Sequence, residues 1–138
     1  MNFNKVFLGG TCAGTTWRKD LINLIQVDYF DPIVEDWTHE CIAIEDAEKD
    51  VVCNIHLYVI TADMIGVYSI AEAVQSSLTK GKSTILHVMP EGFGKSQLKS
   101  LDAVCSLVRG NGAIAYIDND LARTARVINF AFKTEGYR

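Results

Sequence analysis

The sequence lacks most features that mark extracellular, membrane-bound or nucleic-acid-binding proteins. Its four cysteines form no CxxC pair and have no histidine at metal-ligand spacing, which favours free, mostly buried thiols in a reducing cytoplasm. No apolar stretch approaches the ~20 residues that cross a bilayer, and the first residues lack a signal-peptide pattern. The net charge is -4 without a basic run, which argues against a nucleic-acid polymer as partner but not against a single nucleotide. We therefore expect a cytoplasmic protein without membrane contact.

The motifs of several common active sites are missing as well. There is no P-loop, no GxGxxG fingerprint, no Ser-His-Asp set and no metal-binding cluster. His56 and His87 lie inside apolar runs, where a histidine is expected to belong to the core. With 49% hydrophobic and 22% charged residues, the 138 residues fit one packed domain spanning 1–138, and no repeat, linker or low-complexity segment interrupts it.

Short apolar runs alternate with segments of helical spacing along the chain. This alternation predicts an α/β fold, a doubly wound five-stranded parallel sheet with the flavodoxin-like, Rossmann-like strand order 2-1-3-4-5. In that order, ligands bind at the switch point beyond the carboxyl ends of the first and third strands. The predicted strands cover 5–9, 27–30, 55–60, 83–88 and 112–117, and the predicted helices cover 16–25, 38–54, 69–79, 96–109 and 121–133.

The loop after the first strand is one candidate binding element. It contains three glycines and three threonines and begins with Gly9, Gly10 and Thr11. Such a loop offers backbone N–H groups and hydroxyls to a phosphate or to sugar hydroxyls, and Arg18 is placed to pair with a phosphate. The alternative is a tight strand-to-helix turn with Thr16 as the helix N-cap and Arg18 in solvent.

The loop after the third strand leads to the candidate catalytic carboxylate. A helix predicted to begin at Ser69 places Glu72 in its first turn, beyond a loop that contains Gly66. On the functional interpretation, Gly66 and Ser69 line the pocket, and an ionised Glu72 can attack or stabilise an electron-poor sugar carbon. The alternative is a capping box in which Glu72 folds back to the Ser69 backbone and has no chemical role. The spacing alone favours neither. Asp63, in the same loop, is a candidate proton donor or base, or a turn residue.

A third segment, residues 29–37, lies at the same predicted edge of the sheet. It offers the carboxylate of Asp31 and the aromatic face of Trp37, on which a base could stack. The alternative is a proline-directed loop with Trp37 packed over the core.

Taken in order, four segments resemble the nucleoside 2-deoxyribosyltransferase superfamily, and most closely its small branch from bacteria and phages. The resemblance covers the chain up to the end of the predicted helix 69–79, and the remainder mainly as fold pattern. The segments are Val6-Phe-Leu-Gly-Gly-Thr11 with Trp17-Arg18, Tyr29-Phe-Asp-Pro32 with Asp36-Trp37, Leu57-Tyr-Val-Ile60, and Gly66-Val-Tyr-Ser-Ile-Ala-Glu72.

The resemblance implies cleavage or exchange of the N-glycosidic bond of a (deoxy)nucleoside or nucleotide without a cofactor. In this family a glutamate at the position of Glu72 attacks the anomeric carbon and holds a covalent glycosyl-enzyme. A second base then takes the sugar in transferases, and water takes it in hydrolases. An aspartate assists the leaving base, a role for which Asp63 is our candidate. The first loop would lie beside the sugar or its phosphate, and Asp31 and Trp37 would help line the pocket.

The chain also departs from the family pattern. The better-known transferases have an aspartate six residues before the nucleophile, where this chain has Gly66. They also complete the pocket with the C-terminal region of a neighbouring subunit, so the resemblance implies a homo-oligomer, with residues 133–138 as the candidate tail. Gly66 favours a second hypothesis, a non-catalytic protein that binds a nucleotide or a nucleotide-derived signal. A third hypothesis is a flavodoxin-like carrier.

Overall fold

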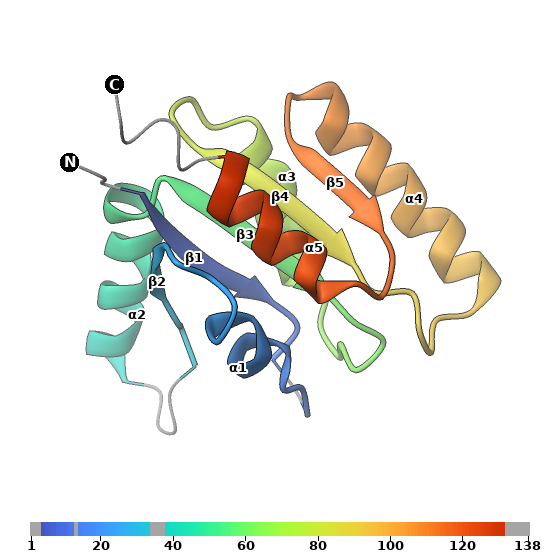
Figure 1. The fold of residues 1–138 in the computed structure, drawn as a ribbon, viewed down its shortest axis with the longest axis horizontal. Helices are drawn as coiled ribbons and strands as arrows, with labels where there is room; N and C mark the ends of the chain where they lie inside the picture. Colours follow the sequence, from blue (N-terminus) through green and yellow to red (C-terminus); the bar gives the residue numbers. More distant parts are fainter. Residues whose placement is uncertain (1–3, 13, 34–37, 132–138) are drawn as a thin grey trace.

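The computed structural model describes residues 4–12, 14–33 and 38–131, and its sheet has the predicted architecture (Figure 1). Five parallel strands lie in the order β2-β1-β3-β4-β5, so the predicted α/β class and strand order are confirmed. Two strands begin later than predicted, β2 by one residue and β5 by two. The strands are β1 (Lys5–Gly10), β2 (Asp28–Phe30), β3 (Ile55–Ile60), β4 (Ser83–Val88) and β5 (Ile114–Ile117).

A helix follows each strand, as the alternating pattern predicts. The predicted helix 38–54 is an α-helix continued by a π-helical turn, and α3 begins one residue before the predicted Ser69. The helical elements are α1 (Trp17–Ile22), α2 (His39–Ala47), η1 (Glu48–Val52), α3 (Tyr68–Ser77), α4 (Lys95–Gly110), α5 (Leu121–Arg126) and η2 (Val127–Ala131).

The helices cover the two faces of the sheet and produce two hydrophobic clusters. Trp17 and Leu21 of α1 and Ala125 of α5 pack on one face, where α5 crosses in front of the sheet in Figure 1. Ala73 of α3 and Leu101 of α4 pack with the opposite face. Every residue of β3 is buried because this strand is central and covered on both sides, which explains its continuous apolar sequence.

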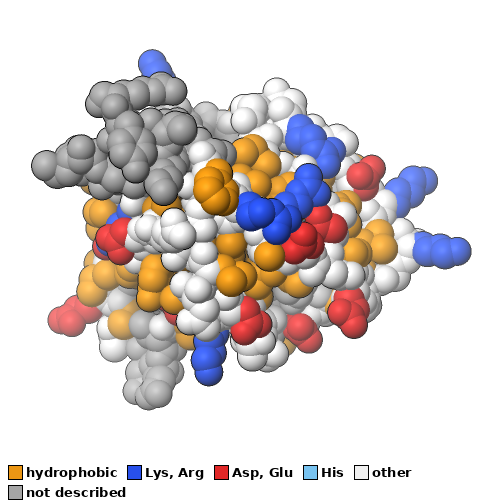
Figure 2. Space-filling model, in the orientation of Figure 1, with side chains coloured by type: hydrophobic (Ala, Val, Ile, Leu, Met, Phe, Trp, Pro, Cys, Tyr) orange, Lys and Arg blue, Asp and Glu red, His pale blue; other side chains and the backbone are white. Residues whose placement is uncertain are grey.

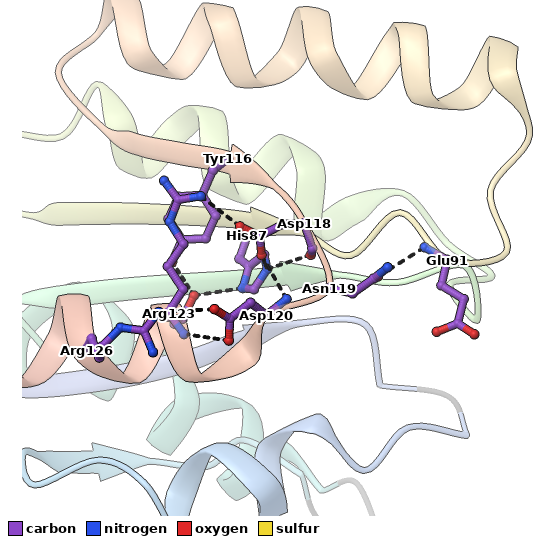
Figure 3. Close-up of polar contacts among 9 residues, drawn as sticks. His87, Glu91, Tyr116, Asp118, Asn119, Asp120, Arg123 and Arg126 are labelled. Carbon is purple, nitrogen blue, oxygen red and sulfur yellow. Dashed lines mark hydrogen bonds and ion pairs between the residues drawn. The ribbon is translucent and has the colours of Figure 1, made fainter.

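A polar network with a buried centre attaches α5 to β4 and β5 (Figure 3). His87 Nδ1 lies 2.7 Å from Thr124 Oγ1, and His87 Nε2 lies 2.9 Å from Asp118 Oδ1. Thr124 also hydrogen-bonds to the Tyr116 hydroxyl, and Arg123 donates to the second Asp118 oxygen at 2.7 Å. The order Thr124, His87, Asp118 resembles a nucleophile–base–acid set, but Thr124 and His87 are both 0% exposed. The network is therefore structural, and His87 is the core histidine that the sequence predicts.

A second buried histidine connects η1, β3, α3 and β4. His56 Nε2 lies 2.6 Å from the Lys49 carbonyl oxygen, and Nδ1 lies 2.8 Å from Ser76 Oγ, which in turn contacts Thr84 Oγ1. Burial lowers the pKa of His56 to about 4, so the ring is neutral at pH 7. His56 is 4% exposed, which confirms the second core histidine.

Among the described residues of the face that carries α5, Figure 2 shows no broad basic surface. Arginines over this helix lie beside carboxylates, with Arg123 paired to Asp118 and Arg126 paired to Asp120. Within the described ranges, no helix combines the length and hydrophobicity needed to cross a membrane.

The cysteines, all of them described, form no disulfide. The prediction of mostly buried thiols is right for Cys53 and Cys105 and wrong for Cys12, which is exposed in the first loop. Cys41 is intermediate in burial.

Candidate functional site

Two adjoining pockets lie where the fold predicts ligand binding, at the carboxyl ends of β1 and β3. They share Gly10, Cys12 and Ser69. The larger, here the Glu72 pocket, has a volume of about 390 Å³ and the smaller, here the Gly66 pocket, about 280 Å³. The Glu72 pocket is lined by Phe7, Gly9, Gly10, Cys12, Arg18, Pro32, Ile33, Glu45, Ser69 and Glu72. The Gly66 pocket is lined by Gly10, Thr11, Cys12, Met64, Ile65, Gly66, Tyr68 and Ser69.

The first glycines are required by the close approach of β1 to β3. A Cβ on Gly10 would lie 2.1 Å from the Val59 carbonyl oxygen, and the backbone there has φ of +113°. A Cβ on Gly9 would lie 2.7 Å from the Tyr58 ring. Any side chain at Gly10 would therefore push β1 away from β3 and strain the backbone. These glycines shape the floor of the Glu72 pocket.

Thr11 fastens the first loop to the loop that leads towards Glu72. Its Oγ1 accepts a hydrogen bond from the Thr61 backbone N–H at 2.9 Å, and its own N–H donates to the Val59 carbonyl at 2.9 Å. Thr11 is 4% exposed, so its hydroxyl is used within the protein. The two loops are held in one fixed arrangement.

Arg18 stabilises the same loop through hydrogen bonds to its backbone. Its guanidinium donates to the carbonyl oxygens of Leu8 at 2.9 Å, Thr11 at 2.8 Å and Gly10 at 3.2 Å, and its Nε lies 3.8 Å from Asp31 Oδ1. Burial lowers the pKa of Arg18, but a guanidinium stays protonated in proteins. With 6% exposure, Arg18 is not the solvated residue of the alternative interpretation. It stabilises the loop and contributes positive charge to one wall of the pocket.

The structure excludes the capping box as an explanation of Glu72. Helix α3 has Val67 at its N-cap with no side-chain cap, and Glu72 lies in the second turn rather than in the predicted first turn. The Glu72 side chain is 12% exposed, and its Oε2 accepts a hydrogen bond from Lys49 Nζ at 3.0 Å. The helix dipole therefore acts on Glu72 less than the sequence suggested. The partner of Glu72 is instead the Lys49 ammonium group, from a neighbouring element.

Lys49 reaches Glu72 from η1. Burial alone lowers the pKa of Lys49, but the hydrogen bond and charge of Glu72 outweigh it and raise this pKa above its usual value. Lys49 is therefore a cation at pH 7. It occupies one Glu72 oxygen and offsets the charge of a largely buried carboxylate.

Glu45 is a second carboxylate in the Glu72 pocket. It lies on α2, one helical turn before Lys49. Burial first, and then the charge of Glu72, raise the pKa of Glu45. From the sequence, 38–54 was predicted only as a polar helix, and neither Glu45 nor Lys49 was predicted to lie at the site. One sequence feature could have pointed to them. Glu45 and Lys49 are four positions apart on a predicted helix that follows the 29–37 segment.

The remaining predicted site residues are not all brought together. Asp63 lines a different pocket of about 350 Å³ with Met89 and Glu91, and it does not line the Glu72 pocket. Asp31 accepts from the Ile33 N–H at 3.0 Å, a local turn beside the pocket. Trp37 lies outside the described residues. Over the described part of the chain, no group of three His, Cys, Asp or Glu could hold a metal ion.

Residues 4–90 match the family described as nucleoside 2-deoxyribosyltransferase like. The chain belongs to this family. The matched range begins just before β1 and ends just after β4, so it contains both loops, Glu45, Lys49 and Glu72. No curated protein and no solved structure gives a significant match.

Proposed function

We propose that the protein cleaves or exchanges the N-glycosidic bond of a (deoxy)nucleoside or nucleotide, with Glu72 as nucleophile. The observation that carries the proposal is the position of Glu72. Its carboxylate lines a pocket of about 390 Å³ at the switch point of the sheet. That volume falls within the range of small-molecule sites. The chain that forms this sheet belongs to the nucleoside 2-deoxyribosyltransferase-like family.

The geometry supports a double displacement. A Glu72 oxygen attacks C1′ of the sugar while the C1′–N bond breaks and its electrons leave with the base, which takes up a proton. Water or a second base then attacks C1′, loses a proton and releases Glu72. Lys49 holds Glu72 Oε2 and fixes the direction of the side chain, while Phe7 and Pro32 offer apolar surface in the same pocket.

The first test is base release and base exchange on purine and pyrimidine deoxynucleosides and their 5′-monophosphates. Mass spectrometry of the intact protein and its peptides should find a glycosyl adduct on Glu72. Glu72→Gln should abolish both signals, while the exposed, remote Asp102→Asn should leave them unchanged. Base release at the wild-type rate by folded Glu72→Gln would refute the assignment.

Loss of activity in Glu72→Gln must be separated from misfolding. The substitution leaves Lys49 without its carboxylate partner, and breaking a buried ion pair costs roughly 3–5 kcal/mol. The double variant Lys49→Met, Glu72→Gln removes the remaining charge. It should recover thermal stability because no unpaired buried charge remains. It should stay inactive because it lacks the Glu72 nucleophile.

Gly66 favours a second function, binding of a nucleotide without turnover. An aspartate is absent at this position, and Glu72 is already engaged by Lys49. Thermal stabilisation by a nucleotide without base release or adduct would support this function, and any Glu72-dependent turnover would dismiss it.

The proposal includes assembly into a homo-oligomer, as the family resemblance suggests. Large apolar side chains are exposed beside the pockets: Ile42 is 48%, Ile65 90%, Val67 70% and Tyr68 72% exposed. A subunit packed here would cover apolar surface next to Glu72. Light scattering coupled to size exclusion should give a mass above the 15.3 kDa of one chain.

A further inference from the structure

We propose that the Tyr58 hydroxyl is a second hydrogen-bond donor for Glu72, acting through one water molecule, and that it speeds release of the sugar from Glu72. The inference rests on the proposed function, in which Glu72 carries the sugar as a covalent intermediate. Tyr58 lies on β3 and acts on Glu72 rather than on the substrate, so it is a positioning residue.

The Tyr58 hydroxyl is a polar group without a partner on an otherwise buried side chain. Tyr58 is 1% exposed, and its hydroxyl forms no hydrogen bond with residues 4–12, 14–33 or 38–131. In the same ranges, no side-chain oxygen or nitrogen that is closed off from solvent lacks a partner. The small accessible part of Tyr58 must therefore include its hydroxyl. Burying a hydroxyl without a hydrogen bond is unfavourable, so this group indicates a partner that comes from solvent.

The hydroxyl-bearing side chain shares a pocket with Glu72. This pocket, here the Tyr58 pocket, has a volume of about 230 Å³ and is lined by Tyr58, Glu72, Lys49 and Gln75 among other residues of β3, α3 and η1. It adjoins the Glu72 pocket, because Glu72 lines both. A cavity of this size with several polar groups is suited to ordered water, which needs two to four polar partners.

One oxygen of Glu72 remains available to such a water. Lys49 donates to Glu72 Oε2, whereas Oε1 accepts no hydrogen bond from any residue that the structure describes. No hydrogen bond joins Tyr58 to Glu72 directly, so their contact requires a water that accepts from the hydroxyl and donates to Oε1. A carboxylate oxygen has two lone pairs, so Oε1 can accept from this water and still attack C1′.

The packing around Tyr58 fixes the direction of its ring. A Cβ on Gly9 would lie 2.7 Å from two of the ring atoms, so the ring occupies the space that this glycine leaves open. The rings of Phe7 and His56 lie 6.5 and 6.3 Å from it, centre to centre. Burial, and then the negative charge of Glu72, raise the pKa of Tyr58, so the hydroxyl keeps its proton and acts as a donor.

A purely structural role explains the hydroxyl less well. Phe7 and Phe30 pack on the same face of the sheet with their ring centroids 5.9 Å apart, and neither carries a polar group. A phenylalanine at position 58 would keep the ring contacts without burying a hydroxyl.

The donor acts on the two steps of the reaction in opposite directions. In the first step Glu72 Oε1 bonds to C1′, the C1′–N bond breaks, and its electrons leave with the base, which takes up a proton. The carboxylate thereby loses its negative charge. In the second step water or a second base attacks C1′ and loses a proton, and the electrons of the C1′–Oε1 bond return to Glu72. A hydrogen bond to the charged form favours that form, so Tyr58 assists the second step.

Tyr58→Phe tests the inference, because it removes the hydroxyl and keeps the ring. After formation of the glycosyl adduct from a deoxynucleoside, we expect its decay in water or with a second base to slow about 10-fold. The value of kcat/KM, which reports adduct formation, should stay within a few-fold of wild type, so kcat and KM fall together. Rapid-quench mass spectrometry of Glu72 measures both steps.

Tyr116→Phe is the matched control. It also removes the hydroxyl of a buried tyrosine, one that bonds to Thr124 and lines neither the Glu72 pocket nor the Tyr58 pocket. Both steps should keep their wild-type rates in this variant. A crystal structure of the wild type at high resolution gives a readout besides activity, and should show an ordered water between Tyr58 Oη and Glu72 Oε1.

Two results would overturn the inference and leave the proposed function standing. One is wild-type decay of the adduct in Tyr58→Phe, and the other is an equal slowing of formation and decay, which a structural defect would cause. Thermal denaturation shows whether the variant is folded. Absence of both adduct and turnover in the wild type on every donor would overturn the proposed function, and this inference with it.

Discussion

At the scale of single residues, the spacing around Glu72 fits two interpretations, and its contact with Lys49 removes one of them, the capping box. A Ser-x-x-Glu spacing fits a capping box and a catalytic carboxylate equally well. The capping box is excluded because Glu72 is bonded instead to Lys49, which is 23 positions earlier in the sequence and donates to it at 3.0 Å. No local pattern contains that contact, because it depends on how η1 packs beside α3.

Gly66 allows a direct gain-of-function test. No atom lies within 4 Å of an ideal Cβ at Gly66, and its backbone is outside the left-handed region. We expect Gly66→Asp to change the free energy of unfolding by less than about 1 kcal/mol. It should raise base release at least about 10-fold, because it supplies a carboxyl to the adjoining pocket. Gly66→Asn, equal in size but without an acidic proton, should not. Equal rates in the two variants would contradict the prediction.

Cys12 reports on occupancy of the site. It is exposed and lines both the Glu72 pocket and the Gly66 pocket, whereas Cys53 and Cys105 are buried. We expect iodoacetamide to alkylate Cys12 before Cys53 or Cys105, and a bound nucleoside to slow this reaction. Peptide mass spectrometry over time measures both, with Cys41 as the internal control for a thiol outside these two pockets. Equal slowing at Cys41 would point to a general effect rather than to pocket occupancy.

At the scale of elements, the pairing of β1 with β3 sets the position of the site. The parallel register places Gly10 opposite Val59, so the two strands end together and their following loops meet. The contact of Thr11 with Thr61 then joins those loops.

Two glycines of the first loop should respond very differently to alanine. Gly10→Ala introduces a Cβ 2.1 Å from the Val59 oxygen at φ of +113°, and we expect it to lower the free energy of unfolding by more than about 3 kcal/mol. Gly14→Ala meets no atom within 4 Å at φ of +62°, so its cost should be about 1–2 kcal/mol. Urea denaturation measures the free energy of unfolding of both variants. Similar losses would show that the close contact of β1 with β3 does not determine the cost at Gly10.

Much of the fold was predictable from periodicity, and much of the site was not. The buried runs at 55–60 and 83–88 are long and apolar, so β3 and β4 match their predicted bounds. Both ends of α1 and the start of β5 were missed because caps and pairing partners, rather than apolar spacing, determine them. Among the residues at the Glu72 pocket, Gly10 and Glu72 could be predicted from their loops, whereas Glu45 and Lys49 lie on an exposed, weakly amphipathic helical segment. Arg18 was placed near the site, yet its three carbonyl partners could not be inferred from the sequence.

At the scale of the whole molecule, buried neutral groups make stability depend on pH. His56 connects four elements and is 4% exposed, with its pKa lowered to about 4 by burial. The unfolded chain, with an ordinary histidine pKa of about 6.5, binds the proton more tightly. Stabilisation by neutral His56 is therefore complete above about pH 6.5 and is lost as the pH falls towards 4.

We expect this effect to reach about 3 kcal/mol by pH 4. Urea denaturation of wild type and His56→Gln between pH 7 and 4 measures it, since the variant should lose that part of the slope. Nitrogen chemical shifts of the imidazole should show a single neutral tautomer down to about pH 5. Parallel stability curves for the two proteins would contradict the assignment.

The hydrogen bond from the Thr61 N–H to Thr11 Oγ1 has a kinetic consequence. Because it joins the two loops before any ligand arrives, we expect them to move as one unit rather than to close independently. Binding then loses little chain entropy and needs no preceding rearrangement. Nucleoside association should therefore be a single second-order step whose observed rate rises linearly with concentration, and differences in affinity among nucleosides should arise mainly in how fast each one dissociates.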